Sequence, residues 1–226
     1  MLNLTGVAET LVDNVRLKLA DNTPSERRWS DEEVLAAVNT GEREVARRTY
    51  DIRDSSTSAI CTVTIEEDVA TYDLSTKVLY IERMECSYDG YPLSKRTIAW
   101  LDEERKTWKV DEGMPDFVEG RTSFTVTPIP TDEHAGYYFY LTVVRLPLLD
   151  LSESNATPEV HEKFYEDIED YACYKLKMKR DADTFDPEGA MGFYALFEKS
   201  VGARPDANIE RVIKEEPSGL RIQVRL

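Results

Sequence analysis

Catalysis by a thiol needs a cysteine with a histidine base beside it, and both residue types are scarce in this chain. Cys61, Cys86 and Cys173 are far apart and odd in number, which suits neither a disulfide framework nor a paired-cysteine metal site. His134 falls in a polar loop and His161 in the first turn of an expected helix. We therefore expect buried, unreactive thiols and two surface histidines, and the sequence predicts no catalytic residue.

Carboxylates are abundant, but their spacing matches no familiar catalytic or metal site. The acidic runs 66–68 and 102–104 lack the spaced oxygen ligands and the internal glycine of a calcium loop. Phosphate-binding glycine loops, dinucleotide-binding motifs and serine nucleophile elbows are also missing from the sequence. We expect no metal, no cofactor and no enzymatic activity. A hydrolase with two distant acids stays an alternative, because such a pair leaves no local signature.

The aromatic run Tyr137, Tyr138, Phe139 and Tyr140 is a candidate binding surface. Successive side chains of a strand point to opposite faces, so at most half of these rings can line one site. Packing in the core on one face and an interface on the other is the simpler interpretation. The alternative is a β-domain binding module that recognises a glycan or a host surface.

The chain of 226 residues carries a net charge of −16, which disfavours binding to nucleic acid through phosphate neutralisation. We expect DNA to be passing cargo at most, beside an acidic wall that repels it. Its longest apolar runs are far shorter than the roughly 20 residues that span a bilayer, and the first residues do not resemble a signal peptide. We therefore expect no membrane association and folding inside the cell.

Helical patterns at both ends of the sequence enclose a strand-rich middle. Residues 1–50 predict two helices, the second starting with a capping box between Ser30 and Glu33. Residues 157–204 predict two more, each starting at a proline in the first turn, at Thr157-Pro158-Glu159 and Asp186-Pro187-Glu188.

Alternating apolar residues in 51–148 predict an antiparallel β-domain, a sandwich or an open barrel, whose strongest strand covers 137–146. A change of phase within 79–86 predicts a bulge near Glu82 and Arg83. The fold class is therefore α+β: the N- and C-terminal helices form one bundle, and the β-domain is inserted between them.

The last segment, 205–226, is predicted to be an extended C-terminal arm. Apolar and polar residues alternate without a break from Leu220 to Leu226, after a stretch typical of a hinge at 215–219. An exposed amphipathic strand favours association. It pairs either with the chain's own sheet or with a partner's sheet or groove.

Several segments, in their order, resemble the phage head–tail adaptor (connector) family, which includes the tail tubular A type subunits of podoviruses. The resemblance begins with Arg28-Trp29-Ser30-Asp31-Glu32-Glu33-Val34-Leu35 and continues through Tyr72-Asp73-Leu74 and Tyr88-Asp89-Gly90-Tyr91-Pro92-Leu93. It ends with Tyr140 to Pro147 and Thr157-Pro158-Glu159-Val160-His161. Order and spacing carry the resemblance. One departure is Ser75-Thr76, where the family often has a proline.

The resemblance implies a structural virion protein that docks under a portal ring, links it to the tail and lines the DNA exit channel. Its implied partners are the portal protein, a tail or nozzle protein and further copies of itself, in a ring of twelve. It would assemble in the host cytoplasm and reside in the neck or tail region of the virion. A different neck or tail-completion protein is an alternative.

In that family the C-terminal arm reaches into the portal, which agrees with the alternating pattern of the last residues. Our hypothesis is that apolar contacts come from alternate residues and that two arginines meet portal carboxylates. The predicted portal-binding residues are Leu220, Arg221, Ile222, Val224, Arg225 and Leu226.

Overall fold

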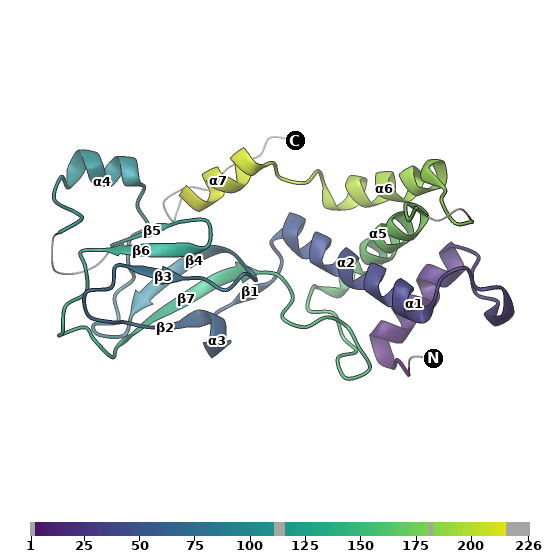
Figure 1. Cartoon of the computed structure of the whole chain (residues 1–226), viewed down its shortest axis with the longest axis horizontal. Coiled ribbons are helices and arrows are strands. Elements are labelled where there is room, and N and C mark those ends of the chain that lie inside the picture. The colour runs from purple at the N-terminus through teal and green to yellow at the C-terminus, as the bar shows by residue number, and fades with distance from the viewer. Residues whose placement is uncertain (1–2, 111–115, 181–182, 216–226) are drawn as a thin grey trace. The chain divides into compact units, whose positions relative to one another are not determined.

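The computed structural model describes residues 3–110, 116–180 and 183–215 (Figure 1). The chain divides into two compact units, each with contributions from distant parts of the sequence. The helical unit combines Met1–Ile52 with Leu146–Arg204. The β unit combines Arg53–Arg145 with the described residues from Pro205 onward. The predicted division at residues 50, 148 and 205 stays a prediction.

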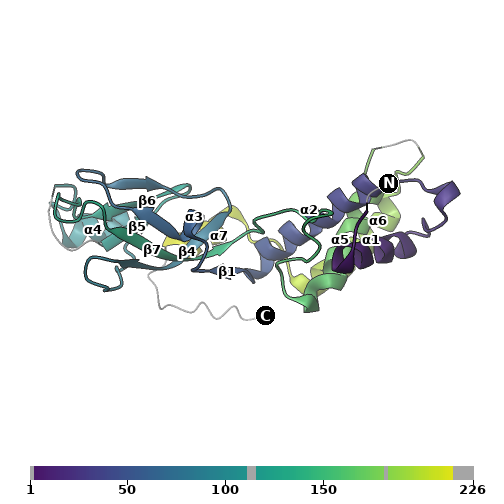
Figure 2. The same ribbon diagram turned by 90° about the horizontal axis from the view of Figure 1, so that it is seen from below.

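Four helices of the helical unit share one apolar core, and their ribbons lie together in Figure 2. They are α1 (Gly6–Lys18), α2 (Asp31–Thr49), α5 (Tyr165–Lys177) and α6 (Pro187–Val201). Two short 3-10 turns, η1 (Pro24–Glu26) and η2 (Glu162–Phe164), precede α2 and α5. Helix α5 contacts α1, α2 and α6, so it is the central element of this unit.

The start signals of two helices are confirmed. Ser30 Oγ accepts a hydrogen bond from the Glu33 amide at 3.2 Å, and Glu33 Oε2 accepts one from the Ser30 amide at 2.9 Å. This capping box begins α2. Asp186 caps α6 by accepting from the Gly189 amide at 2.9 Å.

The helix start predicted at Thr157 is wrong, because α5 begins only at Tyr165, after η2. The amide of Glu159 donates to Glu42 Oε1 at 2.7 Å, and the amide of His161 donates to Asp51 Oδ2 at 2.8 Å. Carboxylates from α2 and the residues after it thus hold this segment in a non-helical course.

The β unit contains two antiparallel sheets (Figure 1). In the first, β7 (Tyr138–Arg145) pairs on one side with β4 (Val78–Cys86) and on the other with β1 (Arg53–Asp54) and β2 (Thr62–Thr64). In the second, β6 (Ser123–Thr127) lies between β3 (Thr71–Asp73) and β5 (Asp116–Glu119). The strongest predicted strand is therefore the centre of the larger sheet.

Residues from both sheets build one apolar core. Tyr72 stacks on Phe124 at 5.4 Å between ring centroids, and both rings make T-shaped contacts with Phe139 from the larger sheet. The mixed α+β class is confirmed. Of the two predicted β architectures the open barrel is wrong, since the two sheets of the described residues do not close on each other.

The pairing of β4 with β7 shifts register between Ile81 and Arg83, where the bulge was predicted. The shift lets Ile81, Met84 and Cys86 all face the core, although a regular strand would point Ile81 and Met84 to opposite sides. The bulge is confirmed.

Three helices of the β unit were not predicted: α3 (Ser58–Cys61), α4 (Ile98–Glu104) and α7 (Ala207–Glu215). Helix α7 lies against β4 and β5 and begins where Asp206 accepts hydrogen bonds from the amides of Asn208 and Ile209. The extended arm predicted from residue 205 is therefore wrong for residues 207–215.

Candidate interaction surfaces

The predicted portal-binding residues lie outside the described part of the chain, so their role stays a prediction. The full set is Leu220, Arg221, Ile222, Val224, Arg225 and Leu226.

The cysteines are buried, as expected, and free. Burial raises the pKa of the Cys61 thiol to about 11 and that of Cys173 to about 12, which disfavours the reactive thiolate. His134 is buried rather than exposed, contrary to the prediction: its Nδ1 lies 3.0 Å from Thr131 Oγ1. His161 is exposed, and its Nδ1 accepts from the Lys163 amide. Both histidines thus have local structural partners.

Metal sites and membrane-spanning helices are both absent from residues 3–110, 116–180 and 183–215. No cluster of three or more histidine, cysteine, aspartate or glutamate side chains is suited to hold a metal ion. None of the helices within these ranges has the length and apolar character needed to span a bilayer.

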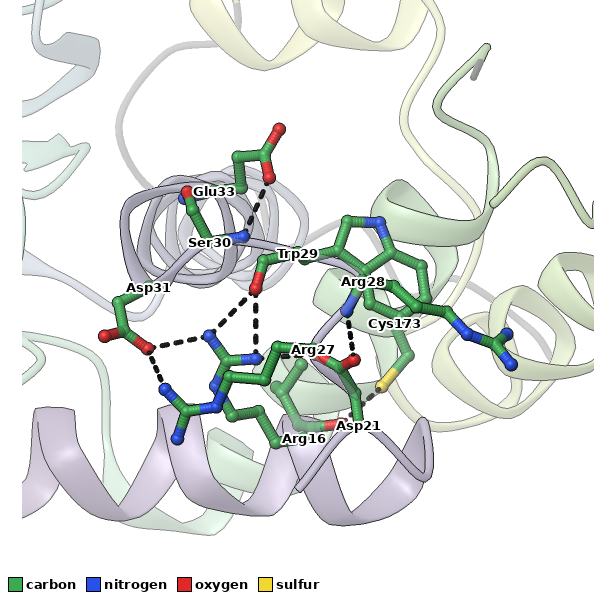
Figure 3. A network of polar contacts seen from close by, with 10 residues as sticks. Arg16, Asp21, Arg27, Arg28, Trp29, Ser30, Asp31, Glu33 and Cys173 are labelled. Carbon is green, nitrogen blue, oxygen red and sulfur yellow. Dashed lines mark hydrogen bonds and ion pairs between the residues drawn. The ribbon is translucent and has the colours of Figure 1, made fainter. Parts of the chain in front are cut away.

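A buried arginine joins the segment between α1 and α2 to α1 (Figure 3). Arg16 Nη1 donates to Asp21 Oδ2 at 2.6 Å, and its Nη2 donates to Asp31 Oδ1 at 2.7 Å. Both Nη atoms also reach the carbonyl of Trp29 at 3.2 Å. Only 2% of the Arg16 side chain is exposed, and these charge-assisted bonds replace the hydration of its two Nη atoms, while the buried Nε makes no hydrogen bond. This network fixes Trp29 and the start of α2, the segment on which the family resemblance begins.

A second buried arginine fixes the end of α6. Arg48 pairs with Glu44 at 2.9 Å within α2 and donates to the carbonyl of Gly202 at 2.7 Å. Its guanidinium lies over the rings of Tyr194 and Phe197, 5.7 and 4.8 Å from their centroids, within reach of cation–π attraction. The arrangement holds Gly202 at the C-terminal end of α6.

A buried ion pair in the β unit covers the bulge of β4. Lys95 Nζ lies 2.8 Å from Glu119 Oε2, and both side chains are at least 97% buried. The amide of Ile81 also donates to the two carboxylate oxygens of Glu119, at 3.0 and 3.1 Å. Glu119 thus replaces the strand partner that Ile81 lacks on that side of the sheet.

The aromatic run divides as predicted for three of its four residues, whereas Tyr137, expected on the same face as Phe139, precedes β7 and is 40% exposed. Phe139 is fully buried in the β core, whereas Tyr138 and Tyr140 are 40% and 47% exposed on the opposite face of the sheet. Their rings stack at 6.2 Å between centroids. Thr62 and Thr64 of β2 are paired with these tyrosines, and Glu85 of β4 is paired with Tyr140. This exposed face offers flat rings beside polar groups.

Glu42 is an unusual buried acid on α2. Burial raises the pKa of its carboxyl to about 7, and the carboxylates of Glu159 and Asp150 act in the same direction. Hydrogen bonds from the backbone amides of Glu159 and Val160 oppose the shift without cancelling it. The folded state therefore holds a proton on Glu42 at pH values where the unfolded chain has lost it.

This linkage predicts that Glu42→Gln changes the pH dependence of stability. In the native protein, the contribution of Glu42 to the free energy of unfolding decreases as pH rises from about 4.5 to about 7, because the folded state binds the proton more tightly than the unfolded chain does. Glutamine stays neutral and keeps an oxygen acceptor for the Glu159 amide. We expect urea unfolding to show a flatter pH profile in this window and higher stability than the native chain at pH 8. Glu9→Gln, an exposed change on α1, is the control, and lower stability of Glu42→Gln at pH 8 would contradict the prediction.

Comparison with known protein families identifies the family of this chain. The family model described as SU10 adaptor protein matches residues 8–218, which cover nearly all of both units. The chain belongs to the SU10 adaptor protein family. This family is one of phage head-to-tail adaptors, so the resemblance seen in the sequence is confirmed. No curated protein matches the chain.

Membership makes this SU10 adaptor a phage structural protein that works with head and tail components.

Proposed function

We propose that this SU10 adaptor is a non-enzymatic virion subunit that docks under the portal ring, links it to the tail and lines the DNA exit channel. Its copies form a ring in the neck of the virion, which we expect to hold twelve, after assembly in the host cytoplasm. The observation that carries this proposal is the family match across residues 8–218, which includes both units.

The charge of the chain supports the part of the proposal that concerns DNA. A net charge of −16 repels phosphate. A ring of such acidic subunits therefore attracts a passing DNA genome far less than a ring of basic subunits would. The DNA is cargo in this proposal and is not bound specifically.

The test is the mass of the purified chain, measured by light scattering alone and after mixing with purified portal rings. We expect the isolated chain to have a low mass and to move into a portal-bound complex with several adaptor copies per portal. An unrelated protein of similar size and net charge is the control. Absence of the chain from the portal fraction at micromolar concentrations would refute portal docking.

A second candidate function rests on the exposed stack of Tyr138 and Tyr140. Flat aromatic rings beside threonine and glutamate side chains suit recognition of a sugar by a phage binding module. Glycan-array binding by the isolated chain that is lost in Tyr138→Ala/Tyr140→Ala, together with no portal binding, would favour this function over the adaptor role.

A further inference from the structure

Strand β3 forms an edge of the smaller sheet, whose strand order is β3-β6-β5. The carbonyl of Ala70 accepts a hydrogen bond from the Val126 amide at 2.8 Å, next to the paired residues of β3 and β6. Hydrogen bonds alternate along an antiparallel pair, so the amides and carbonyls of Thr71 and Asp73 point away from β6. In the part of the chain that the structure describes, these groups form an open edge to which another strand can add.

The side chains along this edge present one polar and one apolar face. Thr71 and Asp73 are exposed, whereas Tyr72 between them is buried in the β core. Val69 and Leu74 pack on the same core but stay only partly buried. Among the described residues, the Asp73 carboxylate has no ion-pair partner. A strand that adds here therefore needs apolar residues on one face, polar residues on the other and a cation opposite Asp73.

The last seven residues of the same chain, 220–226, have the complementary pattern. Their apolar residues alternate with Arg221, Gln223 and Arg225, and none of their side chains is acidic. An arginine of this segment can form charge-assisted hydrogen bonds with the Asp73 carboxylate. An exposed amphipathic strand and an open sheet edge both favour unwanted association, and pairing one with the other removes both hazards.

One register satisfies every position of the edge. In an antiparallel pairing, Arg221 is placed opposite Asp73, where opposite charges meet. Gln223 then lies opposite Thr71, so two polar side chains meet there. A shift by one residue would instead turn the arginines toward the core. The apolar side chains of this register fall on the core side, in the pairs Leu220 with Leu74, Ile222 with Tyr72 and Val224 with Ala70.

The larger sheet offers a poorer edge at β2. The amide of Thr62 already donates to the Ser58 carbonyl at the end of α3, so this edge has one donor fewer. The three residues of β2 are two threonines and a valine, which give an arginine no carboxylate partner.

The connection from α7 is long enough to reach β3 within one copy. Helix α7 ends at Glu215 and packs on β4 and β5. Only β6 separates β5 from β3, which makes two strand spacings of about 4.8 Å each. The five residue steps from Glu215 to Leu220 cover up to about 17 Å when extended, so they can cross this distance.

We propose that residues 220–226 pair antiparallel with β3 of the same copy before assembly, and that the portal displaces them from this edge when it binds them. The edge and the portal then compete for one segment. The fraction of chains whose segment is free sets the apparent affinity for portal. The inference rests on the proposed function, because the competing site belongs to the portal.

The experiment measures binding of a fluorescent peptide of residues 216–226 to two forms of the protein. The chain truncated after Gly219 leaves the β3 edge vacant, whereas in the full-length chain its own segment occupies the edge. We expect fluorescence polarisation to show at least fivefold tighter binding to the truncated chain than to the full-length chain. Circular dichroism verifies that the truncated chain keeps its fold.

Substitutions at the edge of the truncated chain make the test specific. Asp73→Pro removes an edge donor that β6 does not use, so it should lower peptide affinity at least tenfold while the sheet stays intact. Asp73→Arg should lower peptide affinity several-fold, and a peptide with Arg221→Asp should regain it. Glu67→Arg makes the same charge change at an exposed residue of the loop before β3 and is the matched control, which should bind the native peptide within twofold of the truncated chain.

In the full-length chain, Asp73→Pro should raise portal affinity several-fold, because the segment is then free; unchanged affinity overturns the competition. Equal peptide binding by the truncated and full-length chains, or none by a folded truncated chain, overturns the pairing and leaves portal docking intact. Dimers of the full-length chain that Asp73→Pro abolishes would assign the segment to a second copy and overturn pairing within one copy. Peptide binding that depends on the edge, without portal docking, supports the pairing and refutes the proposed function.

Discussion

Replacement of Arg16 by methionine is expected to lower the free energy of unfolding of the helical unit by about 3 kcal/mol or more, the usual cost of removing one partner of a buried ion pair. Asp21 loses its cation at a site where only 1% of its side chain is exposed, and Asp31 keeps only Arg27. The Trp29 carbonyl loses both of its guanidinium donors. Urea unfolding followed by far-ultraviolet circular dichroism measures the loss.

Arg43→Met is the matched control, because Arg43 sits in the same unit and pairs with Asp150 at 2.6 Å on the surface. Exposed pairs contribute about 0–1 kcal/mol, so this variant should stay close to the native stability. Adding Asp21→Asn to Arg16→Met should recover part of the loss, since the uncompensated buried charge is removed. A loss for Arg16→Met no larger than that of Arg43→Met would show that the network is not what stabilises the start of α2.

Truncation after Gly219 is expected to reduce portal binding by tenfold or more while leaving the fold unchanged. The removed residues alternate apolar and polar side chains, and burial of even one leucine or isoleucine contributes roughly 1.5–3 kcal/mol, against 1.4 kcal/mol for each tenfold in affinity. Titration of portal with the truncated and full-length chains measures the effect, and circular dichroism checks the fold.

A full-length variant separates the sequence of the arm from its length. Serine at Leu220, Ile222, Val224 and Leu226 keeps every residue position but removes the apolar alternation, and we expect it to bind portal as weakly as the truncated chain. Arg221→Glu/Arg225→Glu tests the two predicted charge contacts. The loss of portal affinity in this variant should be larger at low salt than at high salt. Unchanged affinity after truncation would exclude the arm from the portal contact.

Local signals predicted local structure well. The capping box at Ser30, the proline at the start of α6 and the alternation of β7 each depend on residues within a few positions, and each is confirmed. The phase change within β4 even located the bulge. Such patterns reflect backbone hydrogen bonds and side-chain directions that are determined by residues close together in the sequence.

Long-range partners account for the failures. The start signal at Thr157 is overridden because Glu42, 117 positions away, takes the Glu159 amide. His134 is buried under contacts with Tyr88 that its polar neighbours in the sequence do not suggest. Helix α7 was missed because the alternating pattern of the last seven residues was extended back to 205, although Asp206 has the type and position of an N-cap.

The β unit is built from two stretches of sequence, since α7 joins it after the chain has already returned through α5 and α6. Residues 53–145 alone therefore lack part of the β unit. If they were expressed alone or transferred to a related adaptor, β4 and β5 would lose their contacts with α7, which is encoded about 60 residues later. Recombination between phages would have to exchange both stretches together. We therefore expect the sequence of the inserted sheets and the part of the gene that encodes α7 to vary together.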